Sequence, residues 1–403
     1  MITYEQSIKE LQNIELEDIG YERVFLSDAL GRVLNRDIVA QHNYPQAPTA
    51  SMDGYAIKHA NLADGRIKIN STDNPAGSSQ NFTLSNSEAI KTFTGSLMPS
   101  GSDTLINIEN VHVEDDYIVI DKEVPYGFSV RPCAESYAKG DVLLKKGTLI
   151  EFAQIGVLAE LNTVMVEVVK KPTVAILATG SEILDIGQEK LYASQIRSSN
   201  NYTLEALSKM SGASTVQLGT CKDDFESIKE AYNNALHVSD IVVSTGGVSV
   251  GDYDFVKDVI PALGAKVIYK GVKIKPGQHI MLAQKANKLI VALPGFAYSS
   301  TVTFLLYVVP IIAKILHRSS PLKVLKATLN EDWQKRTKKS EFSACNVHVV
   351  DGKYEVDFED KRAGSSAILT NLLENSGLMI THGDSKIIKK GSEVEVILLE
   401  KFI

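Results

Sequence analysis

Residues 241–255 read I-V-V-S-T-G-G-V-S-V-G-D-Y-D-F, and this stretch decides the fold. The β-branched apolar run at its start is typical of a buried parallel strand, and a helical pattern begins near Asp254. Paired glycines such as Gly246 and Gly247 bring bare N–H groups close to a ligand, and a following helix adds the positive end of its dipole. The order strand, glycine loop, helix therefore predicts a phosphate-binding α/β domain.

The glycine loop differs from a P-loop in its last positions. Gly246 and Gly251 have the G-x4-G spacing, but the expected Lys and Ser or Thr are replaced by Asp252 and Tyr253. A carboxylate beside a phosphate repels it unless a metal ion lies between them, so Asp252 and Asp254 are candidate Mg²⁺ ligands. The alternative is a tight strand-to-helix turn in which Asp254 is the helix N-cap.

Length, charge and cysteine content limit the class of protein. The 403 residues are enough for several domains at roughly 100–200 residues each. A formal net charge of -7 argues against nucleic acid as the main partner, and three separated cysteines without a C-x-x-C pair indicate reduced thiols. The start of the chain lacks a signal-peptide pattern, and the longest apolar run, residues 302–313, is too short to span a bilayer. We predict a cytoplasmic protein with no nucleic-acid or membrane partner.

Composition and periodicity divide the chain into four parts. Residues 41–140 carry short strand-like runs between turn residues, which indicates an inserted β-rich domain. Residues 319–403 return to strands and predict a small barrel or sandwich with a helix at 366–374. The N-terminal and linker domain comprises residues 1–40 and 141–170, with helices expected at 3–11, 24–34 and 152–161 and a strand at 163–169.

Residues 171–318 alternate strands with helices, which predicts a doubly wound parallel sheet. Its last helix, residues 299–316, is expected to be interrupted at Pro310. Ligands bind at the carboxyl ends of the strands in such sheets. The acidic residues at these ends are Glu182, Asp223, Asp252 and Asp254. We expect them to form one metal-binding rim, while solvated charge or helix caps are the alternative.

Two groups of basic residues are candidates for binding an anion. Lys275, with Lys270 and Lys273 before it, lies next to a Pro-Gly turn and could receive an oxyanion, although strand-edge lysines also serve solubility. The run K-R-T-K-K at residues 335–339 lies in the first long loop of the C-terminal part. We interpret that run as solvated charge.

Seven motifs are spread over essentially the whole chain: S-M-D-G-Y-A at 51–56, F-T-G at 93–95, R-P-x-x-E at 131–135, T-G-S-E at 179–182, S-T-G-G-V-S-V-G-D-Y-D at 244–254, K-P-G at 275–277 and L-P-G at 293–295. With them the chain resembles the molybdopterin molybdenumtransferases, or molybdenum insertases, the MoeA family that includes the C-terminal domain of gephyrin. The glycine loop and T-G-x-E also occur in other molybdopterin-binding domains. The S-M-D-G-Y-A unit narrows the match to this family.

The resemblance implies an enzyme of molybdenum cofactor biosynthesis. Such enzymes take adenylyl-molybdopterin and molybdate, cleave the pyrophosphate in a Mg²⁺-dependent step, release AMP and leave molybdenum on the dithiolene. The implied fold is multidomain: a doubly wound molybdopterin-binding domain with a β-rich inserted domain and a C-terminal β-barrel-like domain. The family implies an elongated homodimer, with the active site between one protomer's α/β domain and the other's β-rich parts. The adenylyltransferase and apo-molybdoenzymes are further expected partners.

The motif match also assigns site residues. Those at catalytic positions are Asp53, Thr94, Glu182, Asp223, Asp254 and Lys275. Those expected to bind the pterin and its phosphates are Thr179, Gly180, Ser244, Gly246, Gly247, Ser249, Gly251, Asp252, Pro294, Arg131 and Ser365. The expected metal ligands are Asp254, Asp252 and Glu182.

The chain departs from the family pattern at several positions. Phe296 and Ala297 replace the Asn and Pro that commonly follow L-P-G, and Gln278 and His279 replace the Lys and Pro that follow K-P-G. Gly271 occupies a position that is often basic, with Lys270 and Lys273 on either side. The R-x-x-G-E-D loop of the family reads R-P-C-A-E-S at residues 131–136. These changes concern the contacts with the anion.

Three other functions remain open at this level: a non-catalytic molybdopterin-binding or scaffold protein, an insertase that prefers tungstate, and an adenylyltransferase or hydrolase built on the same α/β domain. A scaffold has no need of the acidic residues Asp53, Glu182, Asp223 and Asp254. A single-domain relative would lack the β-rich insertion and the C-terminal β domain. Both observations favour the insertase.

Overall fold

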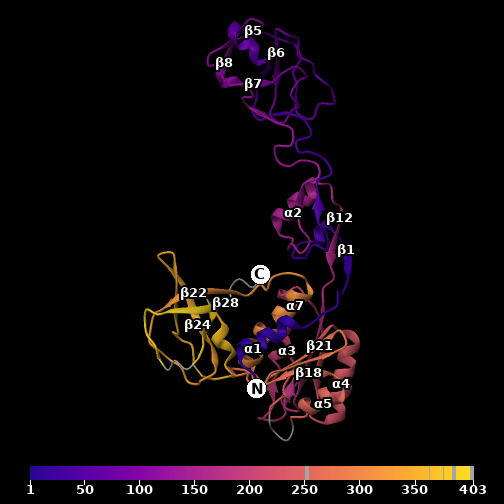
Figure 1. The fold of residues 1–403 in the computed structure, drawn as a ribbon, viewed down its shortest axis with the longest axis vertical. Coiled ribbons are helices and arrows are strands. Elements are labelled where there is room, and N and C mark those ends of the chain that lie inside the picture. Colours follow the sequence, from indigo (N-terminus) through magenta and orange to yellow (C-terminus); the bar gives the residue numbers. More distant parts are fainter. Residues whose placement is uncertain (250–253, 363, 375, 384–386, 400–403) are drawn as a thin grey trace. The chain divides into compact units, whose positions relative to one another are not determined.

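The computed structural model describes residues 1–249, 254–362, 364–374, 376–383 and 387–399 (Figure 1). The chain forms two compact units. The first comprises Met1–Asn35, Gly147–Glu151 and Met165–Ile403, and the second comprises Arg36–Lys146 and Phe152–Val164. The finer division into four domains stays a prediction.

A six-stranded sheet forms the centre of the first unit. Its order is β16 (Ser214–Cys221), β13 (Thr173–Thr179), β17 (Ile241–Thr245), β21 (Lys288–Leu293), β20 (Met281–Lys285) and β18 (Lys266–Lys270). The first four strands pair in parallel, as expected from the sequence. Strand β20 was not expected; it pairs antiparallel with both β21 and β18.

Alternate residues of the central strands enter two separate cores, as expected for a doubly wound sheet. Ile241 and Val243 of β17 belong to one core, and Val242 between them belongs to the other. The first core includes residues of α3 (Asn200–Met210), α6 (Ala297–Thr303) and α7 (Val309–Ile315). The second includes residues of α4 (Phe225–Val238) and α5 (Val256–Ala262). The glycine loop therefore leaves a strand that is buried on both faces.

The last helix of this domain is continuous rather than interrupted. It runs over Ala297–Ile315 and contains a π-helical turn, η4 (Phe304–Val308), directly before α7 with Pro310 near its start. Proline has no N–H to donate, and a widened turn accommodates its ring without ending the helix. By length and composition this helix could cross a membrane, but its apolar window is 89% buried inside the protein. It is a core helix.

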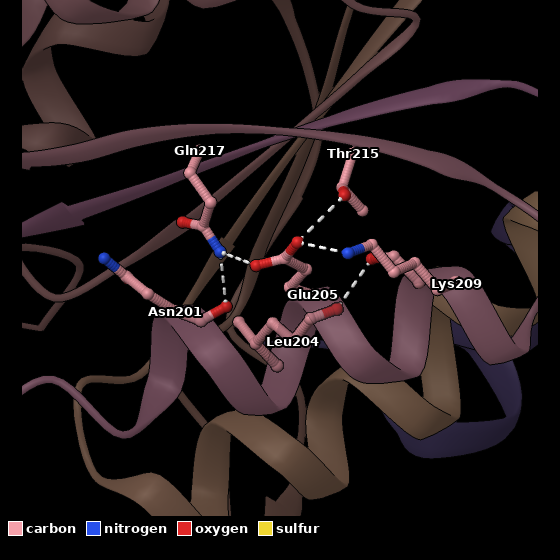
Figure 2. A network of polar contacts seen from close by, with 7 residues as sticks. Asn201, Leu204, Glu205, Lys209, Thr215 and Gln217 are labelled. Carbon is pink, nitrogen blue, oxygen red and sulfur yellow. Dashed lines mark hydrogen bonds and ion pairs between the residues drawn. The ribbon is translucent and has the colours of Figure 1, made fainter. Parts of the chain in front are cut away.

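Polar contacts fasten α3 to the edge strand β16 (Figure 2). The carboxylate of Glu205 accepts hydrogen bonds from Lys209 Nζ at 2.5 Å and Gln217 Nε2 at 2.9 Å. Gln217 Nε2 also donates to the Asn201 carbonyl at 2.8 Å. Hydrogen bonding to Lys209 and Gln217 lowers the pKa of Glu205. These contacts hold the strand whose carboxyl end leads to Asp223.

The C-terminal part is a closed five-stranded barrel, which confirms the barrel-like prediction. Its strands are β24 (Ser340–Val350), β25 (Lys353–Asp357), β22 (Lys323–Leu329), β28 (Glu393–Leu398) and β26 (Ser376–Thr381), and β26 pairs back with β24. Strand β19 (Ile274–Lys275) joins β24 in parallel, and β23 (Trp333–Gln334) pairs with β27 (Ile387–Ile388). The helix predicted at 366–374 is only one 3₁₀ turn, η5 (Leu369–Leu372).

Of the two helices predicted in the N-terminal segment, the structure confirms the first and not the second. Helix α1 (Tyr4–Asn13) begins after Thr3, whose side chain and that of Gln6 form a capping box. The helix predicted at 24–34 does not form. Its place is taken by β1 (Tyr21–Phe25), paired antiparallel with β12 (Met165–Val169), and by the short turn η1 (Leu26–Asp28).

The second unit is mainly β, as predicted for the insertion. Its sheet has the order β7 (Thr104–Asn107), β4 (Gly54–Ile57), β6 (Glu88–Thr92), β5 (Arg66–Ile69), β9 (Tyr117–Ile120) and β8 (Val111–Glu114). Two short pairs are β3 (Thr49–Ala50) with β10 (Val130–Arg131), and β2 (Ile38–Val39) with β11 (Val142–Leu144). The remaining elements are α2 (Phe152–Glu160), η2 (His59–Asp64) and η3 (Ile108–Asn110) here, and β14 (Ile183–Leu184) and β15 (Ile196–Arg197) in the first unit.

Candidate functional site

Three loops pack together at the carboxyl ends of β13, β17 and β21. The amide of Gly246 donates to the Leu293 carbonyl at 3.2 Å, and Gly246 and Gly247 have φ values of +95° and +64°. A Cβ on Gly246 would lie 2.7 Å from the Thr179 carbonyl oxygen. A Cβ on Gly295 would lie 3.6 Å from the Cα of Gly246. A side chain on Gly246 would therefore overlap Thr179, whereas one on Gly295 would make an ordinary contact. The bare backbone at Gly246 is what a phosphate cradle requires.

Thr179 carries an unsatisfied hydroxyl into this arrangement. The residue is 5% exposed, and its Oγ1 has no hydrogen-bond partner among the described residues. The same atom lies 2.8 Å and 3.1 Å from the positions that Cβ atoms on Gly246 and Gly247 would occupy. A buried hydroxyl without a partner is costly unless something else binds it. We therefore predict that the Thr179 hydroxyl donates a hydrogen bond to a bound ligand.

Two predicted acidic residues contact the turn after Thr179. The amide of Ser181 donates to Asp223 Oδ2 at 3.0 Å, although the two residues follow different strands. Both carboxylate oxygens of Glu182 lie 3.0 Å from the position of a Cβ on Gly180, so this side chain folds back over the turn. The adjacent Asp224 caps α4 by accepting from the Ser227 amide at 2.8 Å. Asp223 thus contacts the same turn over which Glu182 folds back.

The far part of the glycine loop is only partly described. Gly251 and Asp252 lie outside the described residues. Helix α5 has Phe255 at its N-cap position, so Asp254 does not occupy the cap that the alternative interpretation gave it. The charge of Asp254 acts on the ring of His279 and raises its pKa, against the larger lowering by burial.

The predicted metal ligands are only partly described. Among the described residues, no three His, Cys, Asp or Glu side chains are arranged to hold a metal ion. Of the predicted ligands Asp254, Asp252 and Glu182, Asp252 lies outside the described residues, so the metal site stays a prediction. Mg²⁺ in phosphate sites is commonly bound by one or two carboxylates and by the substrate's own oxygens.

The other residues of the α/β domain assigned to the pterin differ in placement. The hydroxyl of Ser244 is fully buried and lies 2.5 Å from the Tyr232 hydroxyl, so its side chain belongs to the core, and its assignment to the pterin stays a prediction. Ser249 and Pro294 are half-buried. Lys270 and Lys273 are both exposed, which does not decide between them.

Lys275 and Ser365 come together in a cavity of about 40 Å³ at the rim of the barrel. Ser299 at the start of α6 donates its amide to the Ser366 carbonyl at 3.1 Å, which joins this rim to the L-P-G loop. Sequence reasoning missed three further lining residues, Trp333, Arg336 and Arg362. The basic run around Arg336 was the only signal, and it had been interpreted as solvated charge.

The departures at Gln278 and His279 form contacts of their own. Lys339 Nζ donates to Gln278 Oε1, and Gln278 Nε2 lies 2.7 Å from His279 Nε2. Burial, reinforced by the Lys339 charge, lowers the pKa of His279. Gln278 therefore links the K-P-G segment to the barrel loop that carries Lys339.

Two of the three predicted residues of the second unit are in contact. Asp53 Oδ1 accepts from the amide of Thr94 at 2.8 Å and from its hydroxyl at 2.7 Å. These bonds hold the pKa of Asp53 below its usual range. Arg131 pairs in register with Thr49, on the short strand that leads towards Asp53, and its Nε lies 2.5 Å from Glu135 Oε2.

We expect the Thr179 hydroxyl to matter for binding and not for folding. Replacing it in Thr179→Val removes a polar atom that has no partner in the described part of the chain while keeping the shape, so the melting temperature should be unchanged or higher. Affinity for molybdopterin should fall by about tenfold, the effect of one lost hydrogen bond to a charged group. Calorimetric titration with the pterin and thermal unfolding of the same samples test this. Unchanged affinity would place the hydroxyl outside the site.

Comparison with known proteins agrees with this geometry. Residues 2–162 match the MoeA N-terminal region (domain I and II), and residues 175–314 match a probable molybdopterin binding domain. The molybdopterin molybdenumtransferase of a Nostoc species is 33% identical over 94% of this chain and 88% of its own length. That of Staphylococcus epidermidis is 30% identical over 99% of this chain and 96% of its own.

A solved structure gives the same result. The molybdopterin biosynthesis MoeA protein of Pyrococcus horikoshii superposes with a TM-score of 0.84, at 27% identity and over 99% of this chain and 100% of that one. The fold and the glycine cradle thus define a protein with a molybdopterin-binding α/β domain. The chain belongs to the molybdopterin molybdenumtransferase family, the transferases of molybdenum cofactor biosynthesis.

Proposed function

We propose that this protein inserts molybdenum from molybdate into adenylyl-molybdopterin and releases AMP in a Mg²⁺-dependent reaction. One observation supports the proposal: the buried Thr179 hydroxyl, which has no hydrogen-bond partner among the described residues, lies at a turn of bare glycine backbone that Glu182 and Asp223 also contact. Backbone amides suit phosphate oxygens, and an acidic edge suits a metal-bound pyrophosphate rather than a free one.

The chemistry of each residue determines the role that we propose for it. Backbone around Gly246 and Gly247 binds phosphate, and Thr179 donates a hydrogen bond to the same ligand. Glu182 and Asp254 would hold Mg²⁺ together with substrate oxygens, and the ion would neutralise charge that develops as the pyrophosphate is cleaved. Lys275 attracts the molybdate dianion, and Ser365 contributes to the same cavity.

Residues of the second unit complete the proposed set. Asp53, ionised and held by Thr94, and Arg131 are required for turnover in this account. A homodimeric enzyme and a cytoplasmic location are part of the proposal, as are the adenylyltransferase and apo-molybdoenzymes as partners. The dimer is checked by analytical ultracentrifugation of the purified protein.

AMP release from adenylyl-molybdopterin tests the reaction. The purified protein is assayed with and without Mg²⁺, with molybdate, with tungstate and with neither. The proposal expects AMP only when Mg²⁺ and an oxyanion are both present, and more with molybdate than with tungstate. AMP release without any oxyanion would instead indicate a hydrolase, and a preference for tungstate would change the metal assigned here.

A further inference from the structure

Strand β22 of the barrel (Figure 1) has a neighbouring strand along only part of one edge. On one side it pairs antiparallel with β28 from Lys323 to Thr328. On the other side it pairs in parallel with β25 at only two positions, Thr328 and Leu329. Among the described residues, the backbone of residues 323–327 forms backbone hydrogen bonds with β28 alone. Alternate residues of an antiparallel strand direct their N–H and C=O groups to opposite sides, so this half of β22 has a free edge.

A cavity of about 280 Å³ lies where β22 and β25 separate. Its lining consists of residues 326–328 of β22, residues 352–354 at the start of β25, and Glu393 of β28. Thr328 is opposite Glu355, so the first residue of β25 is level with position 326. The chain turns back into β24 just before that residue, and residues 323–325 therefore have no counterpart on this side.

The tip of the β24–β25 hairpin exposes apolar side chains on the face that is buried further along. Val347 and Val356 are opposite each other in register, and both belong to the barrel core. Two positions nearer the tip, Val349 and Tyr354 are also opposite each other and lie on the same face. They are 67% and 40% exposed. The core-facing side of the hairpin thus continues past the part of the barrel that covers it.

The charge at this opening is positive. Lys326 and Glu393 both line the cavity and bind each other, with Nζ 2.6 Å from Oε1. Lys353 of the lining and Lys323 at the start of β22 are exposed, and neither forms an ion pair within the described part of the chain. Lysines on a free edge disfavour pairing with the same edge of a second copy, because like charges would meet. They favour a partner that carries carboxylates.

We propose that the free edge of β22 binds an extended, acidic segment of a partner protein, which adds a strand to the barrel beside the β24–β25 hairpin. A segment of about five residues matches residues 323–327. Its apolar side chains cover Val349 and Tyr354, and its carboxylates bind Lys353 and Lys323. The surface shares no lining residue with the cavity that contains Lys275, and the proposal does not depend on the proposed function.

Hydrogen exchange of the full-length protein tests the strand addition. The probe is a capped hexapeptide of alternating valine and glutamate. Those amides of residues 323–327 that do not pair with β28 should exchange quickly in the free protein and become protected at saturating peptide. The same peptide with every backbone amide methylated keeps its side chains but cannot donate, so it should give no protection. A hexapeptide of alternating valine and lysine should bind at least about tenfold more weakly, because its charge has the wrong sign.

Calorimetric titration with the valine–glutamate hexapeptide locates the site. Lys353→Gln should weaken binding about threefold, as expected for one exposed ion pair, and Lys353→Glu about tenfold. Lys390→Gln removes an exposed lysine of the same barrel outside the cavity and is the matched control. It should bind as the unaltered protein does. Because these side chains are exposed, all three variants should keep the melting temperature of the unaltered protein.

Several results would overturn the proposal. Binding that is absent, that survives methylation of the peptide, or that falls equally in Lys353→Glu and Lys390→Gln excludes strand addition at this edge. Protection of residues 323–327 in the free protein also contradicts it. Protection that is lost on dilution would assign the edge to a second copy of this chain, and protection at every concentration to another segment of the same chain. AMP release bears only on the proposed function, so either proposal can fail without the other.

Discussion

Replacing Asp53 by alanine should abolish turnover while leaving the protein folded. The Asp53 carboxylate is exposed and ionised, and its visible partners are the amide and hydroxyl of Thr94. In Asp53→Ala these two donors turn to water, so no buried polar group is left unpaired and the melting temperature should change little. The proposed function gives Asp53 a catalytic charge, so its loss should lower kcat roughly a hundredfold or more. AMP release and thermal unfolding are measured on the same preparation.

A matched control and a second variant sharpen this prediction. Asp103 also holds a neighbouring loop of the second unit, through Oδ1, which accepts from the His59 amide at 2.6 Å, but it belongs to none of the motifs. Asp103→Ala should retain activity in the folded fraction. Asp53→Asn keeps an acceptor for Thr94 but loses the charge, and we expect it to be as inactive as Asp53→Ala. Full activity in Asp53→Asn would reduce Asp53 to a support for Thr94.

The second large effect is expected at Gly246. Its φ of +95° disfavours any side chain, and a Cβ would lie 2.7 Å from the Thr179 carbonyl and 2.8 Å from its hydroxyl. Thr179 ends a strand paired on both sides and cannot move away. Gly246→Ala should lower the free energy of unfolding by roughly 2–4 kcal/mol, from backbone strain and overpacking together. It should also displace the cradle, so molybdopterin binding should be lost in the folded fraction.

Gly264 provides the control for this glycine. It has a similar backbone, with φ of +74°, but a Cβ there would meet nothing within 4 Å. Gly264→Ala should cost only the backbone preference, about 1 kcal/mol, and should bind the pterin normally. Urea unfolding and pterin titration of both variants separate the two contributions. Equal losses of stability in the two variants would contradict the close packing of the three loops.

Local pattern was sufficient for the parallel strands, because a fully apolar β-branched run such as residues 241–243 has few alternatives to a buried strand. The local pattern gave wrong predictions where pairing with a segment distant in sequence determines the secondary structure. Val24 pairs with Val166, so an apolar spacing that suggested a helix becomes part of a strand and a turn. Strand β20 was not predicted because its sequence alone does not indicate a strand. Its pairing with β21 stabilises it.

The candidate site shows the same limit. Motif spacing indicated which residues belong together, and the structure joins Asp53 to Thr94 and the Ser181 amide to Asp223. No pattern shows that Ser244 turns its hydroxyl to Tyr232. The guanidinium of Arg336 lies against Gly364, which is distant in sequence. Such features arise from packing between distant segments and become visible only in three dimensions.

Transfer of molybdenum itself is the most direct test of the account. The purified protein is incubated with adenylyl-molybdopterin, Mg²⁺ and molybdate, and the released AMP and the molybdenum bound to the pterin are quantified together by mass spectrometry. The account predicts one molybdenum on the pterin for each AMP released, with neither formed by Asp53→Ala. AMP without pterin-bound molybdenum, or tight pterin binding without turnover, would contradict it and leave a hydrolase or a binding protein.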